Sequence, residues 1–417
     1  MAALATQNEK LVLLGVSGGI AAYKSAEVIR RLADCGIAVQ AVMTPNAQRF
    51  ISPLTLATLS ARPVWADEFP EHIGTPSEKL DPVAHIRLVE QAQALVIAPA
   101  TANVIAKIAL GIADNLLTST VLAWRGPSLV APTMNYRMLE ASATRDNLEA
   151  LAKHGWRIIE PDEGWLACGE TGRGRMASPE RIAASVINEL AKMDGALSGK
   201  RIVVTAGGTR EAIDPVRFVS NASSGTLALK CAMQLALEGA QIDLICGTGV
   251  DERILADIPC SLTRVTTAKE MKAAVDAKVK GCSALLMLAA VADFAPVAAA
   301  EKIKKEEQVA LSLGLERTED ILLGLASEKG FVKIGVSLET QDAPARAKAK
   351  MAAKRLDAVV MVDYRAGESP YGDGGIRSAL LTPSGEALPA ALRPKDELAG
   401  AITHLTIDLV NPKENSK

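Results

Sequence analysis

The sequence has few aromatic residues and nearly balanced charge, and each shortage excludes a class of partner. Phe, Trp and Tyr make up 3% of the 417 residues, which disfavours a surface that stacks nucleobases. The net charge of −2 gives no electrostatic attraction toward nucleic acid or an anionic membrane. We therefore expect neither of them as a partner.

Long apolar runs and a secretory leader are also missing. No apolar run is long enough to span a bilayer. The first residues, MAALATQNEK, lack the basic-then-apolar pattern of a signal peptide. The six cysteines are scattered, without the close pairs that bind zinc or form a redox dithiol. These features predict a cytoplasmic protein.

Short apolar runs that alternate with helical patterns dominate the rest. Strands are predicted in the first half at 10–16, 38–43, 94–99, 128–132 and 156–161, and in the second at 200–208, 241–246, 284–291, 331–336 and 357–362. Continuous apolar strands between amphipathic helices indicate parallel sheets covered on both faces. Because the chain is too long for one core, we predict two doubly wound (Rossmann- or flavodoxin-like) α/β domains. We place them at 1–196 and 197–417, after a predicted helix at 179–193.

The turn VSGGIAAYK, residues 16–24, joins a predicted strand to a predicted helix from Ile20 to about Cys35. Such a turn directs backbone N–H groups and a helix N-terminus at an anion, typically a phosphate. A tight turn without a ligand is the alternative. Small polar residues also follow the strands at VMTPNAQRF and APATANVIAK, and residues after parallel strands line the ligand crevice of open sheets. Three such strand ends favour a nucleotide-sized site.

Three side chains of the first half could carry chemistry, and each has a plain structural alternative. Asn135 in PTMNYRM could bind a polar substrate group or simply form a turn. His85, one of four histidines, could be a general base or a structural residue. Cys168 lies in WLACGETGRGRM, where three glycines indicate a mobile loop that approaches another group closely. Neighbouring arginines could lower the pKa of its thiol, or the cysteine could be incidental.

The second half contains a long polar segment, TAGGTREAIDPVRFVSNASSG at 205–225, after its first strand. Loops of this length are uncommon in compact domains unless they have a function. The lysines of EKIKKEE, residues 301–307, would usually be a solvated face. Placed shortly after Asp293, they could instead bind a triphosphate whose Mg²⁺ this aspartate helps to hold.

In this order, the motifs resemble the bifunctional coenzyme A biosynthesis family, in which phosphopantothenoylcysteine decarboxylase is fused to phosphopantothenate–cysteine ligase. In the first half the likeness rests on SGGIAAYK, APATAN, AHI, PTMN with the later Met138, and ACGETGRGRM. In the second half it rests on GGTREAIDPVRFVSN with SSG, AAVAD and EKIKK. It runs from about Lys10 to the 360s and thins toward the C-terminus.

The resemblance implies that the first half is an FMN-dependent decarboxylase. Family members use FMN to oxidise the cysteinyl thiol of the substrate to a thioaldehyde. The neighbouring carboxylate then leaves as CO₂, because the thioaldehyde accepts its electron pair, and the reduced flavin returns the resulting enethiolate to a thiol. By this likeness His85 would be the base, Asn135 would hold the carboxylate and Cys168 would donate a proton. Glu170 stands where the family usually has aspartate. The implied FMN contacts are Gly18, Gly19, Ile20, Thr44, Ala100 and Thr101.

The resemblance implies that the second half is a ligase that activates phosphopantothenate with CTP. An acyl-cytidylate and pyrophosphate form, and the amine of cysteine then attacks. Asn221 and Arg217 match the positions that handle the acyl intermediate. The implied nucleotide site consists of Ala289, Asp293, Lys302, Val336, Lys350 and Lys354, with Asp293 as the candidate Mg²⁺ ligand.

Three departures from the family pattern concern the ligase. Thr226 follows SSG where lysine is common, Val336 replaces a phenylalanine that packs on the base, and Val362 replaces an asparagine. They leave CTP and ATP open as the nucleotide. Two rival functions also stay open: a flavin oxidoreductase, and a flavin-binding regulatory protein, each with a degenerate ligase domain.

The resemblance finally implies a homo-oligomer. Family decarboxylases build flavin sites between the subunits of trimers, and ligase domains pair as dimers. Together these contacts would give a dodecamer.

Overall fold

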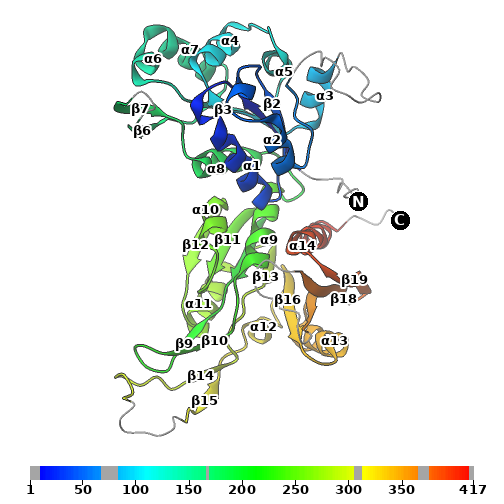
Figure 1. The fold of residues 1–417 in the computed structure, drawn as a ribbon. Coiled ribbons are helices and arrows are strands. Elements are labelled where there is room, and N and C mark those ends of the chain that lie inside the picture. The colour runs from blue at the N-terminus through cyan, green and yellow to red at the C-terminus, as the bar shows by residue number, and fades with distance from the viewer. Residues whose placement is uncertain (1–9, 67–82, 166–168, 305–311, 365–374, 413–417) are drawn as a thin grey trace, which may run out of the picture. The chain divides into compact units, whose positions relative to one another are not determined.

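The computed structural model describes residues 10–66, 83–165, 169–304, 312–364 and 375–412. The chain divides into two compact units, Met1–Leu190 and Ala191–Lys417, which Figure 1 shows in blue to green and in green to red. Each unit has its own mainly parallel sheet with helices on both faces, so the predicted α/β class is confirmed. No helix of the described ranges is long and apolar enough to cross a membrane.

The first unit is built on a five-stranded parallel sheet in the order β2-β1-β3-β4-β5. Its strands are β1 (Leu11–Val16), β2 (Ala38–Met43), β3 (Ala94–Ala100), β4 (Ser128–Pro132) and β5 (Arg157–Ile158). This is the flavodoxin-like order, in which the strand sequence reverses between β1 and β3. The carboxyl ends of all five strands therefore lie along one edge of the sheet.

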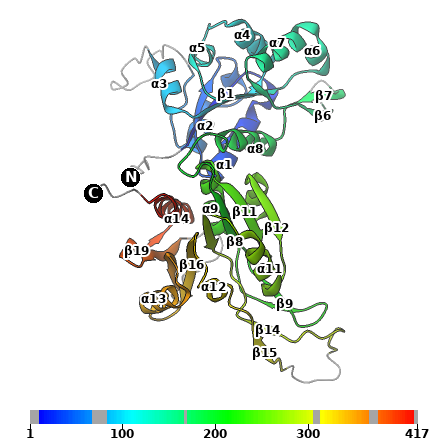
Figure 2. The same ribbon diagram turned by 180° about the vertical axis from the view of Figure 1, so that it is seen from behind.

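Two layers of helices cover this sheet, as the views in Figures 1 and 2 show. One layer contains α1 (Ser25–Asp34), α2 (Pro53–Ser60) and α8 (Pro179–Leu190). The other contains α3 (Ala84–Gln91), α4 (Ala102–Leu110), α5 (Leu116–Ala123) and α7 (Ser142–Lys153). The helix predicted from Ile20 begins as a 3₁₀ turn, Ile20–Lys24, and α1 then buries Val28, Ile29 and Leu32 on one face.

The second unit has an eight-stranded sheet in the order β12-β11-β8-β13-β16-β17-β18-β19. Its strands are β8 (Arg201–Ala206), β11 (Gln241–Cys246), β12 (Cys260–Arg264), β13 (Ala284–Met287), β16 (Val332–Glu339), β17 (Ala358–Asp363), β18 (Ile376–Thr382) and β19 (Gly385–Arg393). The first six follow the Rossmann order, which reverses between β8 and β13. The last two pair antiparallel, an edge that the sequence did not predict.

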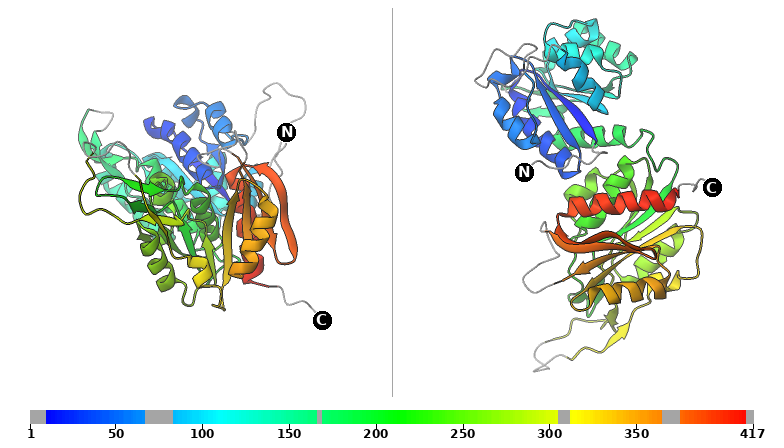
Figure 3. Two further views of the ribbon diagram at one scale, coloured as in Figure 1. Left: turned by 90° about the horizontal axis from the view of Figure 1, so that it is seen from below. Right: turned by 90° about the vertical axis from the view of Figure 1, so that its right-hand side faces the viewer.

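Helices α9 (Thr226–Leu237), α10 (Glu252–Asp257) and α14 (Lys395–Val410) cover one face of this sheet. Helices α11 (Ala268–Lys278), α12 (Ile321–Gly324) and α13 (Ala343–Lys354) pack into the core on the other face, and Figure 3 shows α14 and α13 on opposite sides. Thr267 begins α11 with a capping box that includes Glu270. Gly225, with φ +66°, makes the left-handed turn into α9.

Three antiparallel ribbons extend from the sheets. They are β6 (Asp162–Trp165) with β7 (Thr171–Arg175), β9 (Arg210–Ala212) with β10 (Phe218–Ser220), and β14 (Phe294–Pro296) with β15 (Leu315–Arg317). The expectation of a mobile glycine loop is wrong for 171–175, which form a paired strand. The predicted close approach is present, because a Cβ on Gly174 would lie 2.2 Å from the Met134 carbonyl oxygen.

Three predicted strands end early, and the strand predicted at 200–208 stops at Ala206. The strand predicted at 284–291 stops at Met287, because the backbone N–H groups of Leu288 and Ala289 turn to donate to the side-chain hydroxyl of Thr205. The strand predicted at 156–161 is reduced to Arg157–Ile158. Ile159 still donates a hydrogen bond to Val130, so the chain leaves the sheet just beyond β5.

We predict that the half-buried charge cluster around Asp243 stabilises the second unit at neutral pH. Its carboxylate accepts from Arg201 and Lys278, at 2.8 and 2.7 Å. Burial alone would raise the pKa of Asp243, but the hydrogen bonds and charges of these partners outweigh it and hold the pKa below the ordinary 3.8. Asp243→Asn should lower stability by about 1–3 kcal/mol.

Thermal unfolding across pH tests this expectation. Because the folded pKa is depressed, the loss should be full at neutral pH and shrink as the pH falls below 3.8. Asp396→Asn is the control, since its pair with Lys230 leaves the carboxylate 57% exposed, and its cost should stay below about 1 kcal/mol. Equal losses in the two variants, or a loss that persists in acid, would contradict the assignment.

Candidate functional site

The predicted flavin contacts of the first unit gather at the carboxyl edge of its sheet. Gly18, Gly19 and Ile20 follow β1, Thr44 follows β2, and Ala100 and Thr101 come at the end of β3. Strands β1, β2 and β3 are neighbours, so three short segments meet there. A Cβ on Gly18 would lie 2.5 Å from Cβ of Asn46, so the turn after β1 packs directly against the segment after β2.

A buried hydroxyl that the sequence analysis did not single out joins the two central segments. Ser17 has no exposed surface. Its Oγ donates to the Pro99 carbonyl at 2.8 Å and accepts from the backbone N–H of Thr101 at 3.0 Å. The end of β1 is therefore tied to the end of β3 at the point where the strand order reverses. A serine directly after an apolar strand was the available signal.

Asn135 lies after β4, at the start of the short helix α6 (Tyr136–Glu140). Its side-chain oxygen accepts from the backbone N–H of Arg137 at 2.9 Å, as a helix cap does. The β6–β7 ribbon lies against this segment, because Met134 donates to the Gly174 carbonyl at 3.0 Å and Arg137 pairs with Glu170 at 2.8 Å. Cys168 lies outside the described residues, between β6 and β7.

His85 is the second residue of α3. Because α3 leads into β3, its first turn points toward the carboxyl edge of the parallel sheet. Within the described ranges, Nδ1 of His85 is buried and has no hydrogen-bond partner. Buried polar atoms are almost always paired, so this nitrogen is the feature of the first unit that most favours a missing polar group nearby.

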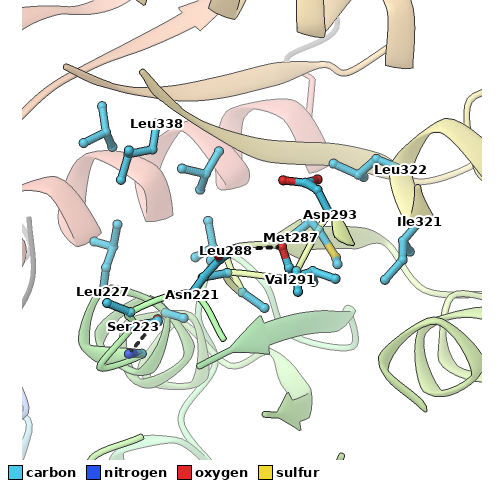
Figure 4. A pocket seen from close by; sticks show the side chains of 18 of the residues that line it. Asn221, Ser223, Leu227, Met287, Leu288, Val291, Asp293, Ile321, Leu322 and Leu338 are labelled. Atoms are coloured by element: carbon cyan, nitrogen blue, oxygen red, sulfur yellow. Dashed lines mark hydrogen bonds between the residues drawn. The ribbon is translucent and has the colours of Figure 1, made fainter. Parts of the chain in front are cut away.

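The second unit contains a cavity of about 460 Å³, in the size range of small-molecule sites. Six of the predicted ligase residues line it: Asn221, Ala289, Asp293, Val336, Lys350 and Lys354. Thr226 and Val362, two of the departures from the family pattern, also line it. Figure 4 shows Asp293 near the middle, with Leu227 on α9 to one side and Ile321 and Leu322 to the other.

Two buried threonine hydroxyls hold the central wall of this cavity. Oγ1 of Thr205 accepts from the N–H groups of Leu288 and Ala289, both at 3.1 Å. Oγ1 of Thr209 accepts from Ala292 at 3.0 Å, and neither threonine has exposed surface. Nδ2 of Asn221 donates to the Val291 carbonyl at 3.0 Å (Figure 4). The loop at 288–293 is thereby fixed against the end of β8, where the strand order reverses.

Two lysines of α13 give the cavity a positive side. Lys354 pairs with Asp320 at 2.7 Å, while Lys350 is half-buried. Burial, together with the charge of Lys354, lowers the pKa of Lys350, although Asp293 and other carboxylates oppose this shift. A desolvated ammonium beside another cation is costly, and an anionic ligand would relieve that cost.

Arg217 and Lys302 do not line the cavity. Arg217 precedes β10, and its Nη1 donates to the carbonyl of Ile303 at 3.2 Å, so the structure brings these two segments together beside the β9–β10 ribbon. Asn221 follows the same ribbon, so it connects this pair to the cavity.

The C-terminal part of the chain also contributes to the cavity, which the sequence analysis did not foresee. Ile376 of β18 and Lys395 of α14 line it, as do Thr318 to Leu322 before and within α12. Lys395 is only 5% exposed, so it adds a third buried or half-buried cation. A single lysine in the first turn of a helix offered no signal for this placement.

The described residues contain no cluster of three or more His, Cys, Asp or Glu side chains that could hold a metal ion. Asp293 is therefore not part of such a cluster.

Comparison with known proteins agrees with the two-unit architecture. A family model described as Flavoprotein matches residues 2–191, and one described as DNA/pantothenate metabolism flavoprotein C-terminal domain matches residues 197–409. The coenzyme A biosynthesis bifunctional protein CoaBC of Bacillus subtilis (strain 168) is 40% identical over 88% of each chain. Its namesake in Vibrio cholerae is 37% identical over 95% of this chain and 97% of that one.

Two solved structures each cover about half of this chain. The C-terminal domain of a CoaBC protein covers 52% of this chain and 99% of that one, with 26% identity and a TM-score of 0.41. A PPC decarboxylase mutant complexed with pantothenoylaminoethenethiol covers 43% of this chain and 97% of that one, with 34% identity and a TM-score of 0.39.

The fold, the cavity and the family matches together define a flavoprotein unit fused to a pantothenate-metabolism unit. The chain belongs to the family of coenzyme A biosynthesis bifunctional proteins.

We predict that Lys350 reacts with an amine-acylating reagent at lower pH than other lysines of α13, because its lowered pKa leaves more neutral amine. The measurement is mass spectrometry of the α13 peptides after brief acylation at several pH values. Exposed Lys348, on the same helix but outside the cavity lining, is the internal control. Identical pH dependence at both lysines would contradict the electrostatic account.

Proposed function

We propose that the chain converts phosphopantothenate and cysteine to phosphopantetheine in two steps. The second unit would join them with a nucleoside triphosphate, and the first unit would decarboxylate the product with the help of FMN. Family membership supports the pair of activities. The observation that carries the assignment is the second-unit cavity at the strand-order reversal, where six ligase residues expected by resemblance converge.

In the ligase step, the cavity would bind CTP with its phosphates toward Lys350 and Lys354. Attack of the phosphopantothenate carboxylate on the α-phosphate would give an acyl-cytidylate and pyrophosphate, and attack of the cysteine amine would then release CMP. Asn221, fixed by its bond to Val291, would hold the acyl group. The 288–293 loop, held by Thr205 and Thr209, would give the nucleotide a preset wall, because a preorganised site costs no rearrangement during reaction.

Asp293 fits a magnesium ion that arrives with the nucleotide. Mg²⁺ is commonly held by one or two carboxylates together with substrate phosphates rather than by a protein cage, and Asp293 lines the cavity. Its carboxylate would be the protein ligand, and the ion would neutralise phosphate charge.

The carboxyl edge of the first unit fits FMN. The glycine turn after β1 supports a phosphate site, and the unpaired Nδ1 of His85 supports a polar group nearby. When bound, FMN would supply oxidation and re-reduction of the cysteinyl group. His85 would take a proton, Asn135 would hold the carboxylate that leaves, and Cys168 would donate a proton; these three roles rest on the family resemblance.

The replacements Thr226, Val336 and Val362 all line the cavity, so they bear on nucleotide choice. The hydroxyl of Thr226 lies 2.9 Å from that of Ser224 and brings no positive charge. Val336 can contact a base but offers no aromatic face. We propose CTP as the nucleotide, with weaker binding than an aromatic and a lysine would give.

A trimer-based homo-oligomer, with ligase pairing to a dodecamer, is part of this proposal by resemblance. So is a cytoplasmic location, which fits the five cysteines of the described residues, since they form no disulfide with one another.

Product analysis by mass spectrometry tests the function. The full chain is incubated with FMN, phosphopantothenate, cysteine and Mg²⁺, with CTP or ATP in separate samples. We expect phosphopantetheine with CTP. Cys168→Ser should still make the cysteine conjugate but no phosphopantetheine, because the return of the enethiolate to a thiol would lose its proton donor.

Other outcomes would reassign the protein. Product with ATP alone would change the nucleotide. No cysteine conjugate with either nucleotide would reject the ligase and leave a flavoprotein with a degenerate second unit. Turnover to phosphopantetheine that Cys168→Ser leaves intact would remove the proposed role of Cys168.

A further inference from the structure

A buried carboxylate outside the cavity joins two segments that the proposed ligase reaction needs. Asp214 lies in the turn between β9 and β10, and its side chain has no exposed surface. Its Oδ1 accepts from the backbone N–H groups of Val216 and Arg217, both at 2.8 Å. Its Oδ2 accepts from the N–H of Ile303 at 3.2 Å and from Nη1 of Arg217 at 3.0 Å.

These four bonds connect parts of the chain that are far apart in sequence. Further bonds tie the same segments, since Arg217 donates to the Ile303 carbonyl and Ala299 donates to the Ile213 carbonyl at 2.9 Å. Lys302 directly precedes Ile303, so its backbone is fixed through Asp214. One carboxylate thereby sets the positions of both predicted ligase cations that lie outside the cavity lining.

The arrangement leaves Arg217 available to a ligand. Its side chain keeps 40% of its surface exposed, and a guanidinium has five N–H donors in a rigid fork. Its bonds to Asp214 and Ile303 both use Nη1. Along an extended strand, Arg217 is at most about 13 Å from Asn221, which is within the length of one elongated substrate.

Fold stability alone is a poor explanation for this cluster. A buried ion pair is often no more stabilising than an apolar replacement, because removing the charges from water is costly. A turn needs only its backbone bonds, whereas Asp214 also orients the exposed guanidinium. Burial would raise the pKa of Asp214, but the N–H groups of Val216, Arg217 and Ile303 and the charge of Arg217 hold it below its ordinary value, so the carboxylate stays ionised at neutral pH.

We propose that Asp214 is a positioning residue of the ligase reaction, which holds Arg217 and the Lys302 segment as a preset cationic pair for the anionic phosphopantothenate. This inference rests on the proposed ligase function. In this account the cavity binds the nucleotide, and the cationic pair of Arg217 and Lys302 binds phosphopantothenate.

The test compares Asp214→Asn with a matched control in the full chain. The amide keeps the shape of the side chain and one acceptor, but its NH₂ group opposes Ile303 N–H and the guanidinium. Asp251→Asn is the control. The Asp251 carboxylate accepts from the backbone N–H of Arg253 at 2.9 Å and from Nη2 of the same arginine at 3.0 Å. Asp251 lies outside the cavity lining.

Three readouts separate positioning from folding. We expect Asp214→Asn to lower kcat/KM for phosphopantothenate by about tenfold or more, as loss of a charge-assisted bond does. The Kd for CTP alone should change by less than about threefold, since neither cation lines the cavity. Hydrogen exchange at the Ile303 amide should quicken, and Asp251→Asn should change none of the three.

A double-mutant cycle with Arg217→Ala tests whether Asp214 acts through Arg217. In that background, Asp214→Asn should cost little further activity. The inference would be overturned if Asp214→Asn and Asp251→Asn had equal kcat/KM, or if the losses in the cycle were additive. It would also be overturned if Asp214→Asn lost CTP binding because the second unit no longer folds cooperatively. A wild-type chain that makes no cysteine conjugate would instead reject the proposed function itself.

Discussion

The structure of each unit depends on a buried hydroxyl at the end of its first strand. Ser17 ties the end of β1 to Pro99 and Thr101 after β3, and Thr205 ties β8 to the loop after β13. In both units these are the neighbouring strands between which the order reverses. An apolar residue there would leave backbone N–H groups without a partner, which is costly in a buried site. The hydroxyl thus fixes the crevice in which doubly wound sheets bind ligands.

The buried hydroxyl lies in different surroundings in the two units. In the second unit, the fixed loop lines a cavity that Lys350 and Lys354 also line, an arrangement suited to a triphosphate. In the first unit, the glycine-containing β6–β7 ribbon packs against Met134 in the segment after β4, and this segment is joined to the end of β3 by the bond from Thr133 to the Ala100 carbonyl. Under the proposed function, similar crevices would bind phosphate-bearing ligands of unlike chemistry, and the loops after each strand would decide which ligand binds.

Much of the fold could be predicted from the sequence because parallel strands are buried on both faces and stand out as continuous apolar runs. The β2 and β11 ranges were predicted without error. The early end of β13 was not, since it depends on a hydroxyl more than eighty residues away in sequence. In the antiparallel β18–β19 edge, β19 is mostly exposed, and its apolar run at 387–392 contains a proline, which argues against a strand. The motifs around Asp293 and Lys350 predicted that these residues belong to one site, and both line the cavity. The positions of Lys395 and Asp214 could not be predicted, because they depend on contacts with residues far away in the sequence.

The central claim is that the second-unit cavity binds the nucleotide. Photo-crosslinking of a base-modified CTP to the full chain, followed by peptide mapping, tests it most directly. The account predicts labelling within 287–293, 336–338 or 318–322, which competes with unmodified CTP and decreases in Lys350→Met but not in Lys348→Met. Competable labelling confined to the first unit, or unaffected by loss of Lys350, would contradict it.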